Sequence, residues 1–344
     1  MKRLFIFVAT LAFSIATAPS ATADPPPGEY TYSEAVAIGL VNSSDDFYRP
    51  PNTPDCPPLP AGPYPSEGED DVIPDDAPEC YMSPESQNII VIVPAPGDLA
   101  FGDPLPVVVT HHFTGSWQER AFGYPQYQGG AARMEVSDPT ICHHCGISQH
   151  LYSRIAGLTG GDFEMEVGWA EINHLTTQTS TCKDADEQQV LTVTQQPGAP
   201  QKPMCHRAFD LQAASFYSFR VRQCGDPGVY RICFGIWDQN ANPPAWRLLR
   251  SWSNVARCQD PDGSSNCIFQ YFHEMASSGT WFDLNGGPDG LKMRNIRART
   301  APFTWPLVGD IQSNHWTDEA NSPYSMCGDA RFYRFRTFHG FQGC

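Results

Sequence analysis

Apolar and polar residues alternate strictly along one stretch near the middle of the chain. The two sets are Phe163, Met165, Val167 and Trp169 on one side and Glu164, Glu166 and Gly168 on the other. This period of two is typical of a strand with one buried face. The pattern therefore predicts a strand over Phe163–Ile172 that packs its apolar face and leaves a row of carboxylates to be explained.

Short segments of the same kind recur from Asn88 onward, β-branched or alternating and separated by Gly, Pro, Asn and Asp. Further strands are predicted at 89–93, 105–109, 146–155, 189–194, 216–223, 230–237, 246–252, 268–275 and 332–338. Segments this short and numerous, with helix nearly absent, indicate an all-β sandwich. We expect residues 86–344 to form this one large domain.

The first residues read as a secretory leader. Lys2 and Arg3 precede an apolar run, and Ala21-Thr22-Ala23 supplies a small-residue cleavage site. We expect a signal peptide over 1–23, and a mature protein that is secreted and extracellular. No later stretch is apolar for long enough to span a bilayer, so no membrane insertion is expected.

Residues 24–85 differ from the rest in composition, being rich in proline and acidic. From Asp24 to Pro104, sixteen Asp or Glu residues face only Arg49. Such a segment buries too little apolar surface to offset its ordering entropy, which predicts a flexible, largely irregular arm. Only Tyr30–Val41 has helical spacing. The acidity excludes nucleic-acid binding, which needs a basic surface.

Twelve cysteines in an exported chain indicate disulfides. Cys258 and Cys267 flank a polar loop symmetrically, which predicts a bridge between them. Cys56 and Cys80 could close a loop within the arm. Cys224 and Cys233 also flank a turn, but a tight turn there sets Cys224 opposite Val229, several residues out of register, so the pattern leaves their pairing open.

Two patterns could hold a metal. Cys142-His143-His144-Cys145, with His111 and His112, could supply zinc ligands, but no second Cys-x-x-Cys follows and export favours disulfides. Asp- and Asn-rich loops at 238–240, 260–263 and 283–289 could bind calcium, but none has a full calcium-loop spacing. We therefore predict neither a metal site nor a cofactor.

A series of short motifs resembles a known group. In order they are Gly146-Ile-Ser-Gln-His-Leu-Tyr152, Glu166-Val-Gly-Trp169, Phe216-Tyr-Ser-Phe-Arg-Val-Arg222, Trp246-Arg-Leu-Leu249 and His273-Glu274-Met275 followed by Trp281. The succession resembles secreted bacterial β-sandwich proteins, which are similar in turn to glutamic peptidases and neprosin-type peptidases. The resemblance implies a concanavalin-like, jelly-roll type sandwich.

The resemblance also implies a candidate catalytic pair, Glu166 and Glu274. In such peptidases two acidic or amide side chains on one sheet face hold a water against a peptide carbonyl. By this resemblance, Glu166 stands where a glutamic peptidase has Gln. Neprosin-type peptidases use two Glu, as this chain would. Two nearby carboxyls can share a proton and work at acidic pH. The alternative is that both are surface carboxylates paired with Arg220, Arg222 or Arg231.

No motif of a serine hydrolase elbow or a nucleotide-binding loop occurs. The function expected first is therefore a secreted binding module for a glycan or envelope polymer, with Trp246 and Trp281 as candidate ligand-binding platforms. The alternative is an acid-active endopeptidase that uses Glu166 and Glu274. Either reading makes an extracellular polymer or protein the partner, and the oligomeric state is not predicted.

Overall fold

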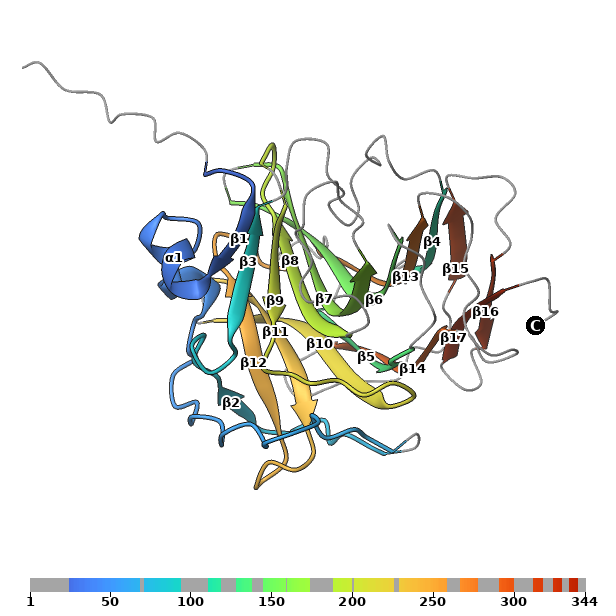
Figure 1. Cartoon of the computed structure of the whole chain (residues 1–344), viewed down its shortest axis with the longest axis horizontal. Coiled ribbons are helices and arrows are strands. Elements are labelled where there is room, and N and C mark those ends of the chain that lie inside the picture. The colour runs from blue at the N-terminus through green and yellow to red at the C-terminus, as the bar shows by residue number, and fades with distance from the viewer. Residues whose placement is uncertain are drawn as a thin grey trace, which may run out of the picture.

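The computed structural model of the chain describes residues 25–68, 71–93, 111–118, 128–137, 145–158, 160–173, 188–199, 201–225, 229–258, 267–277, 291–299, 312–317, 324–329 and 334–339. Nearly all regular structure in these ranges is β, arranged in two sheets (Figure 1). The helices there, α1 (Tyr32–Ala37) and α2 (Ser43–Asp46), are short and lie near the start. The all-β prediction is confirmed.

One sheet has nine strands, each antiparallel to its neighbours. Its order is β1 (Gly28–Thr31), β3 (Ile89–Val93), β9 (Lys202–His206), β8 (Gln189–Gln195), β7 (Asp162–Asn173), β6 (Cys145–Ala156), β13 (Cys267–Ser277), β4 (His111–Gln118) and β15 (Gln312–Thr317). The long strands β7, β6 and β13 lie at its centre. The alternating stretch that predicted a strand is β7, within one residue at each end.

The other sheet has eight strands. Its order is β16 (Tyr324–Asp329), β17 (Arg334–His339), β14 (Leu291–Arg299), β5 (Gly129–Glu135), β10 (Phe216–Cys224), β11 (Arg231–Asp238), β12 (Ala245–Trp252) and β2 (Glu79–Tyr81). Its described strand pairs are antiparallel except that of β2 with β12, which is parallel. β2 comes from the acidic N-terminal segment, so this segment extends the edge of the sheet.

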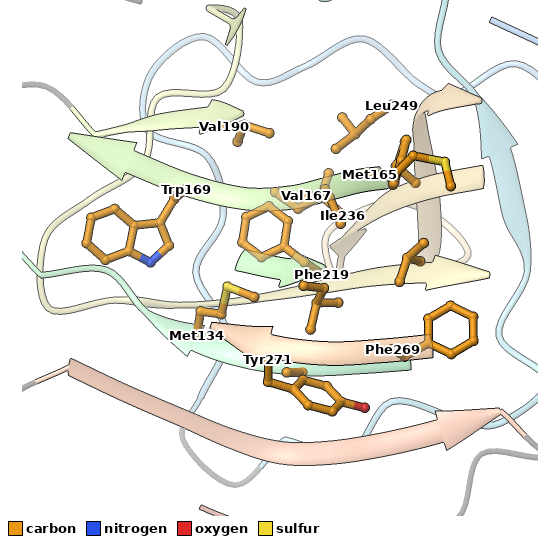
Figure 2. Close-up of a cluster of buried hydrophobic side chains, with 14 of the residues drawn as sticks. Met134, Met165, Val167, Trp169, Val190, Phe219, Ile236, Leu249, Phe269 and Tyr271 are labelled. Carbon is orange, nitrogen blue, oxygen red and sulfur yellow. The ribbon is translucent and has the colours of Figure 1, made fainter. Parts of the chain in front are cut away.

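The core lies between the two sheets (Figure 2). Val167 and Trp169 of β7 are fully buried there, and so are Phe219 of β10 and Ile236 of β11. The alternation in β7 thus predicted correctly which of its faces is packed. In each sheet we call the face toward this core the inner face and the opposite one the outer face.

The outer face of the eight-stranded sheet is strongly basic. On β5, β10 and β14 the residues that alternate with core positions are Arg133, Arg220, Arg222, Lys292, Arg294, Arg297 and Arg299. We call these seven residues the basic face. Seven like charges on neighbouring strands repel one another, so this face needs negative partners.

The acidic segment, residues 24–85, supplies several of these partners. Glu67 pairs with Arg133 at 2.9 Å, Glu79 contacts both Arg220 and Arg222, and Asp75 pairs with Arg297 at 3.0 Å. Regular structure is sparse in the segment, and these ion pairs hold it against the sheet. The prediction weighed only apolar burial and could not see these distant charges.

The acidic segment also enters the core. Tyr64 and Met82 are 2% and 3% exposed and belong to the main hydrophobic cluster. The Tyr64 hydroxyl donates a hydrogen bond to the carbonyl of Trp237 at 2.9 Å. Helix α2 adds a buried ion pair between Asp46 and Arg250 at 2.9 Å. The segment therefore packs as part of the sandwich.

Three disulfides lie among the described residues. Cys258–Cys267 confirms the prediction, and Cys56–Cys80 closes the loop within the acidic segment. Cys224–Cys233 also forms, a pairing that the sequence left open. The turn is wider than assumed: Cys224 lies opposite Arg231, which brings it diagonally beside Cys233. Disulfides of this kind are typical of an oxidising compartment.

Several predicted features lie outside the described residues, among them the leader (1–23), the strand at 105–109, Trp281, the calcium-type loops at 260–263 and 283–289, and Cys142, His143 and His144. His111 and His112 belong to β4 by their backbone. Among the described residues, no helix is both long and apolar enough to cross a membrane.

Candidate functional site

A row of polar residues crosses the outer face at the centre of the nine-stranded sheet. In β6, Ile147 and Leu151 point into the core, so Ser148 and His150 belong to the outer face. In β7 the same alternation assigns Glu166 to the outer face, and in β13 it assigns Glu274, since Phe269 and Tyr271 are core residues. We call Glu166, His150, Ser148 and Glu274 the polar row.

Glu166 is buried although its face is turned away from the core. It is 6% exposed, and its carboxylate oxygen lies 3.9 Å from Nε2 of His150. Nδ1 of His150 lies 3.3 Å from the hydroxyl of Ser148, which is itself 1% exposed. A buried carboxylate, an imidazole and a hydroxyl are thus aligned along two strands.

Tyr152 lies beside Glu166 on the neighbouring strand, directly opposite in the register. Burial raises the pKa of the Tyr152 hydroxyl, and the charges of Glu164 and Glu166 raise it further. The phenol therefore stays protonated throughout the physiological range and can donate a hydrogen bond. The hydrogen bond that contributes to this shift is with Glu164, and Glu166 acts on the phenol through its charge.

The register does not bring Glu166 and Glu274 together. Glu166 lies opposite Tyr152, whereas Glu274 lies opposite Ser148, on the other side of β6. Two strand spacings of ~4.8 Å and four residues of ~3.4 Å put their Cα atoms about 17 Å apart. In the register, His150 and Ser148 of β6 come between the two positions.

A buried network behind the row fixes the strands that carry it. Gln149, fully buried on the inner face of β6, accepts a hydrogen bond from the Trp169 indole at 2.8 Å. Its amide nitrogen donates to the carbonyl of Lys292 at 3.0 Å and lies 2.9 Å from Nε2 of His273. Burial, and then the charge of His150, hold the pKa of His273 well below its usual value. His273 is therefore a neutral, structural residue.

The close approach of β7 to β6 explains why the motif Glu166-Val-Gly-Trp169 contains a glycine, Gly168. A Cβ at this position would lie 1.9 Å from the carbonyl oxygen of Gln149 and 2.7 Å from Cα of His150. Real Cβ atoms do not approach backbone so closely, so only glycine permits this contact of β7 with β6. The glycine thereby sets how close Glu166 comes to His150.

Chemically, the row can hold and move a proton. A neutral imidazole can accept from the Ser148 hydroxyl at one nitrogen and donate toward Glu166 at the other, and a protonated one can donate at both. A carboxylate in a site largely shielded from water is also suited to general acid–base work. The described residues contain no cluster of His, Cys, Asp and Glu side chains that could hold a metal ion.

The arginines expected to neutralise Glu166 and Glu274 lie elsewhere. Arg220 and Arg222 belong to the other sheet and pair with Glu79, and Arg231 pairs with Asp45. The reading of the two glutamates as surface partners of these arginines is therefore wrong. Asp238 of the first calcium-type loop is 2% exposed and accepts a hydrogen bond from Arg247 at 2.7 Å, as a structural ion pair does.

Trp246 does not offer a flat platform for a sugar. It is 5% exposed, the guanidinium of Arg220 lies 4.4 Å from its ring centroid, and Trp237 packs against its edge. The sequence predicted an aromatic here but could not show that the basic face would cover it. The other candidate, Trp281, lies outside the described residues.

Sequence reasoning missed Ser148 and His150 as site residues. The signal was present, since Ser148, His150 and Tyr152 alternate with Ile147, Gln149 and Leu151. Polar Gln149 on the inner face obscured this alternation, because it made both faces of β6 look mixed. Its role as a buried hydrogen-bond centre is visible only when Trp169 and His273 lie beside it.

No protein-family model and no curated protein matches this chain. Among solved structures, it is similar to scytalido-glutamic peptidase with a peptide-based transition state analog, at 9% identity and a TM-score of 0.39. That match covers 67% of this chain and 99% of the other. SCP-B, a member of the Eqolisin family of peptidases in a complex with the tripeptide Ala-Ile-His, gives 8% identity and 0.37, with the same coverage.

A match of smaller extent is the β-porphyranase BpGH16B from the human gut bacterium Bacteroides plebeius. It covers 43% of this chain and 52% of the other, at 8% identity and a TM-score of 0.20. Similarity at these levels carries no argument about activity, which has to come from the residues themselves. The chain thus has glutamic peptidases, which are also β-rich, among its structural neighbours.

Proposed function

We propose that the protein is a secreted hydrolase of peptide bonds that works at acidic pH, with Glu166 as its acid–base residue. The observation that carries the proposal is the Glu166 carboxylate, buried on an outward-turned sheet face and 3.9 Å from the His150 imidazole. A carboxyl in such a place can take a proton from an attacking water and return it to a leaving amine.

Glu274 is the partner that the resemblance implies for Glu166, and the register places it opposite Ser148. An acidic operating pH fits a carboxyl as the acid–base residue, because carboxyls ordinarily titrate below neutral pH.

The test is cleavage of casein or a peptide library by the mature protein at about pH 4. We expect Glu166→Gln to lower kcat by about 100-fold or more, the range of a lost general acid–base group. Glu164→Gln is the matched control, since it lies on the same strand and face but is partly exposed. Absence of cleavage by the wild-type protein between about pH 3 and 8 would reject the proposal, and so would a fully active, folded Glu166→Gln variant.

A second mechanism for the same reaction class is favoured by the 3.3 Å contact of Ser148 with His150. A serine beside a histidine that a carboxylate orients is the arrangement of a nucleophilic hydrolase. The pH profile separates the two: a serine nucleophile needs neutral His150 and activity that rises toward pH 7, and it is lost in Ser148→Ala. Activity that depends on the Glu166 carboxyl falls over that pH range, and Ser148→Ala lowers it less.

The binding-module reading has less support, because buried Trp246 cannot serve as its platform.

A further inference from the structure

A cavity lies between the acidic segment and the loop that joins β11 to β12. Its volume of about 510 Å³ is within the range of cavities that hold a ligand. Residues of the stretch 71–78 form one wall, and the other wall contains Trp237, Pro243 and Pro244. Trp237 alternates with the core residue Ile236, so it belongs to the outer face of the eight-stranded sheet. The polar row lies on the outer face of the other sheet, and the two sites are therefore separate.

Both walls are held in place by contacts within the protein. The Trp237 ring packs edge-on against Trp246, with centroids 5.4 Å apart, and the N–H of Trp246 donates to the carbonyl of Pro78 at 2.8 Å. The side-chain amide of Gln239, another lining residue, donates to the carbonyl of Ser66 and ties the loop to the acidic segment. A cavity that is already formed loses little conformational freedom when it is filled, which favours binding.

Most of the lining is apolar. Proline, alanine and tryptophan side chains make up this part: Pro74, Ala77, Pro78, Trp237, Pro243 and Pro244. Val72 also lines the cavity and is 77% exposed, the most exposed large apolar side chain among the described residues. A ligand with an apolar group would remove this surface from water, which is favourable.

The charged part of the lining is negative. Asp71 and Asp76 line the cavity, and none of its described lining residues is a lysine or an arginine. The Asp71 carboxylate accepts a hydrogen bond from the N–H of Gly68 at 2.5 Å, and neither aspartate forms an ion pair with a described residue. Arg133 also reaches this stretch, where it donates to the backbone carbonyl of Asp71, but it pairs with Glu67. A cation in the cavity would therefore meet two carboxylates.

We propose that this cavity binds a basic peptide segment in which an apolar side chain adjoins an arginine or a lysine. The apolar side chain packs against Trp237 and the prolines, and the cationic group lies beside Asp71 and Asp76. Arginine suits the site best, because its planar guanidinium can donate two parallel hydrogen bonds to a carboxylate. The acidic segment forms one wall, so the bound peptide also stabilises the docked segment.

The experiment is a calorimetric titration of the mature protein with acetyl-leucyl-arginine amide at about pH 7, above the acidic range proposed for cleavage. Two matched peptides carry citrulline in place of arginine, or glycine in place of leucine. We expect the first peptide to bind, and each matched peptide to bind several-fold more weakly because it lacks one of the two contacts. Added salt should also weaken binding of the first peptide, since both carboxylates are exposed to solvent.

The variant that tests the site combines Asp71→Asn with Asp76→Asn. It should weaken binding of the arginine peptide by about tenfold, the combined effect of two exposed charge pairs. Both side chains are exposed, so these substitutions leave the core unchanged. Asp210→Asn changes an exposed carboxylate outside the cavity, so it is the matched control and should bind like the wild type.

Equal binding of the citrulline or the glycine peptide would overturn the proposal, as would unchanged binding in the double variant or no binding of the arginine peptide. Binding that is lost in Glu166→Gln and kept in the double variant would place the peptide on the polar row, which also overturns it. None of these results depends on peptide cleavage, so the cavity and the proposed hydrolase activity are tested separately.

Discussion

Glu67 and Arg133 form an ion pair in which each side chain is 1% exposed, with Nε of the arginine 2.9 Å from the carboxylate. The same carboxylate accepts a hydrogen bond from the hydroxyl of Ser218 at 2.7 Å and another from its backbone N–H. Glu67 comes from the acidic segment and Arg133 from β5. This pair therefore joins the segment to the basic face at a point that water does not reach.

Glu67→Gln should destabilise the protein by about 3–5 kcal/mol, since it leaves the charge of Arg133 buried without its partner. The change in the free energy of unfolding can be measured by urea denaturation. Glu29→Gln is the comparison, because Glu29 pairs with Arg207 at a partly exposed site and should cost about 0–1 kcal/mol. Equal effects of the two changes would contradict a special role for the buried pair.

Gly168→Ala should cost at least about 1–3 kcal/mol, the range for overpacking, because the new methyl group meets the backbone of β6. It should also lower any activity that depends on Glu166 and His150, since the two strands have to move apart. Gly130→Ala is a suitable control: its nearest contact is the Tyr271 hydroxyl at 3.1 Å, a side-chain atom that can shift. Stability measurements and cleavage assays on both variants check the prediction.

Trp169→Phe should lose about 1–3 kcal/mol more stability than Trp252→Phe, because it alone leaves the buried Gln149 oxygen without the indole donor. Both tryptophans belong to the core cluster, so the two changes remove the same ring volume from similar surroundings. Thermal or urea unfolding of the two variants isolates the hydrogen bond. Indistinguishable losses would show that the Gln149 contact adds nothing.

Acid should weaken the fold through His206. Burial, and then the charge of Arg250, lower the pKa of His206 to about 3, so between pH 6.5 and 3 the unfolded chain binds a proton that the folded protein does not. Stability should then fall as pH falls, by about 1.4 kcal/mol per pH unit from this residue. Denaturant midpoints from pH 6.5 to 4.5 measure the slope, which His206→Gln should reduce by that amount.

Glu79 contributes to stability over a separate pH range that lies below that of His206. Burial acts to raise its pKa, but Arg220 and Arg222 outweigh this and lower it to about 2. The stabilisation from Glu79 is complete above pH 4.5 and is lost as pH falls toward 2. An unchanged pH slope in His206→Gln above pH 4.5 would therefore reject the assignment to His206, since Glu79 does not titrate there.

The sequence predicted the strands whose alternation is clean. β3 was predicted to the residue, and β7, β8 and β12 to within one residue, because each has one β-branched or aromatic face. β5 was missed because Gly129-Gly-Ala-Ala132 lacks β-branched residues, and β14 because Arg, Lys and Asn dominate its outer face. One of the charges that disguised β14, Arg297, pairs with Asp75 of the acidic segment.

The candidate site was predictable only in part. Glu166 stands out because a carboxylate repeats on the polar side of an alternating strand. Its neighbour His150 depends on the register of β6 against β7, which no local pattern specifies. The pairing of Glu274 with Glu166 came from the resemblance alone, and the register of β13 places Glu274 opposite Ser148.

The pairing of β2 with β12 has a consequence for the order in which the chain assembles. Glu79 lies opposite Trp246, and the partner of Asp46, Arg250, comes 204 residues later. The acidic segment is synthesised first, yet it cannot dock until β10 to β12 exist. Contacts this distant form slowly. Proline residues and repulsion between carboxylates keep the segment extended and hydrated until it docks. The composition that suggested a flexible arm therefore fits the state of the segment before docking.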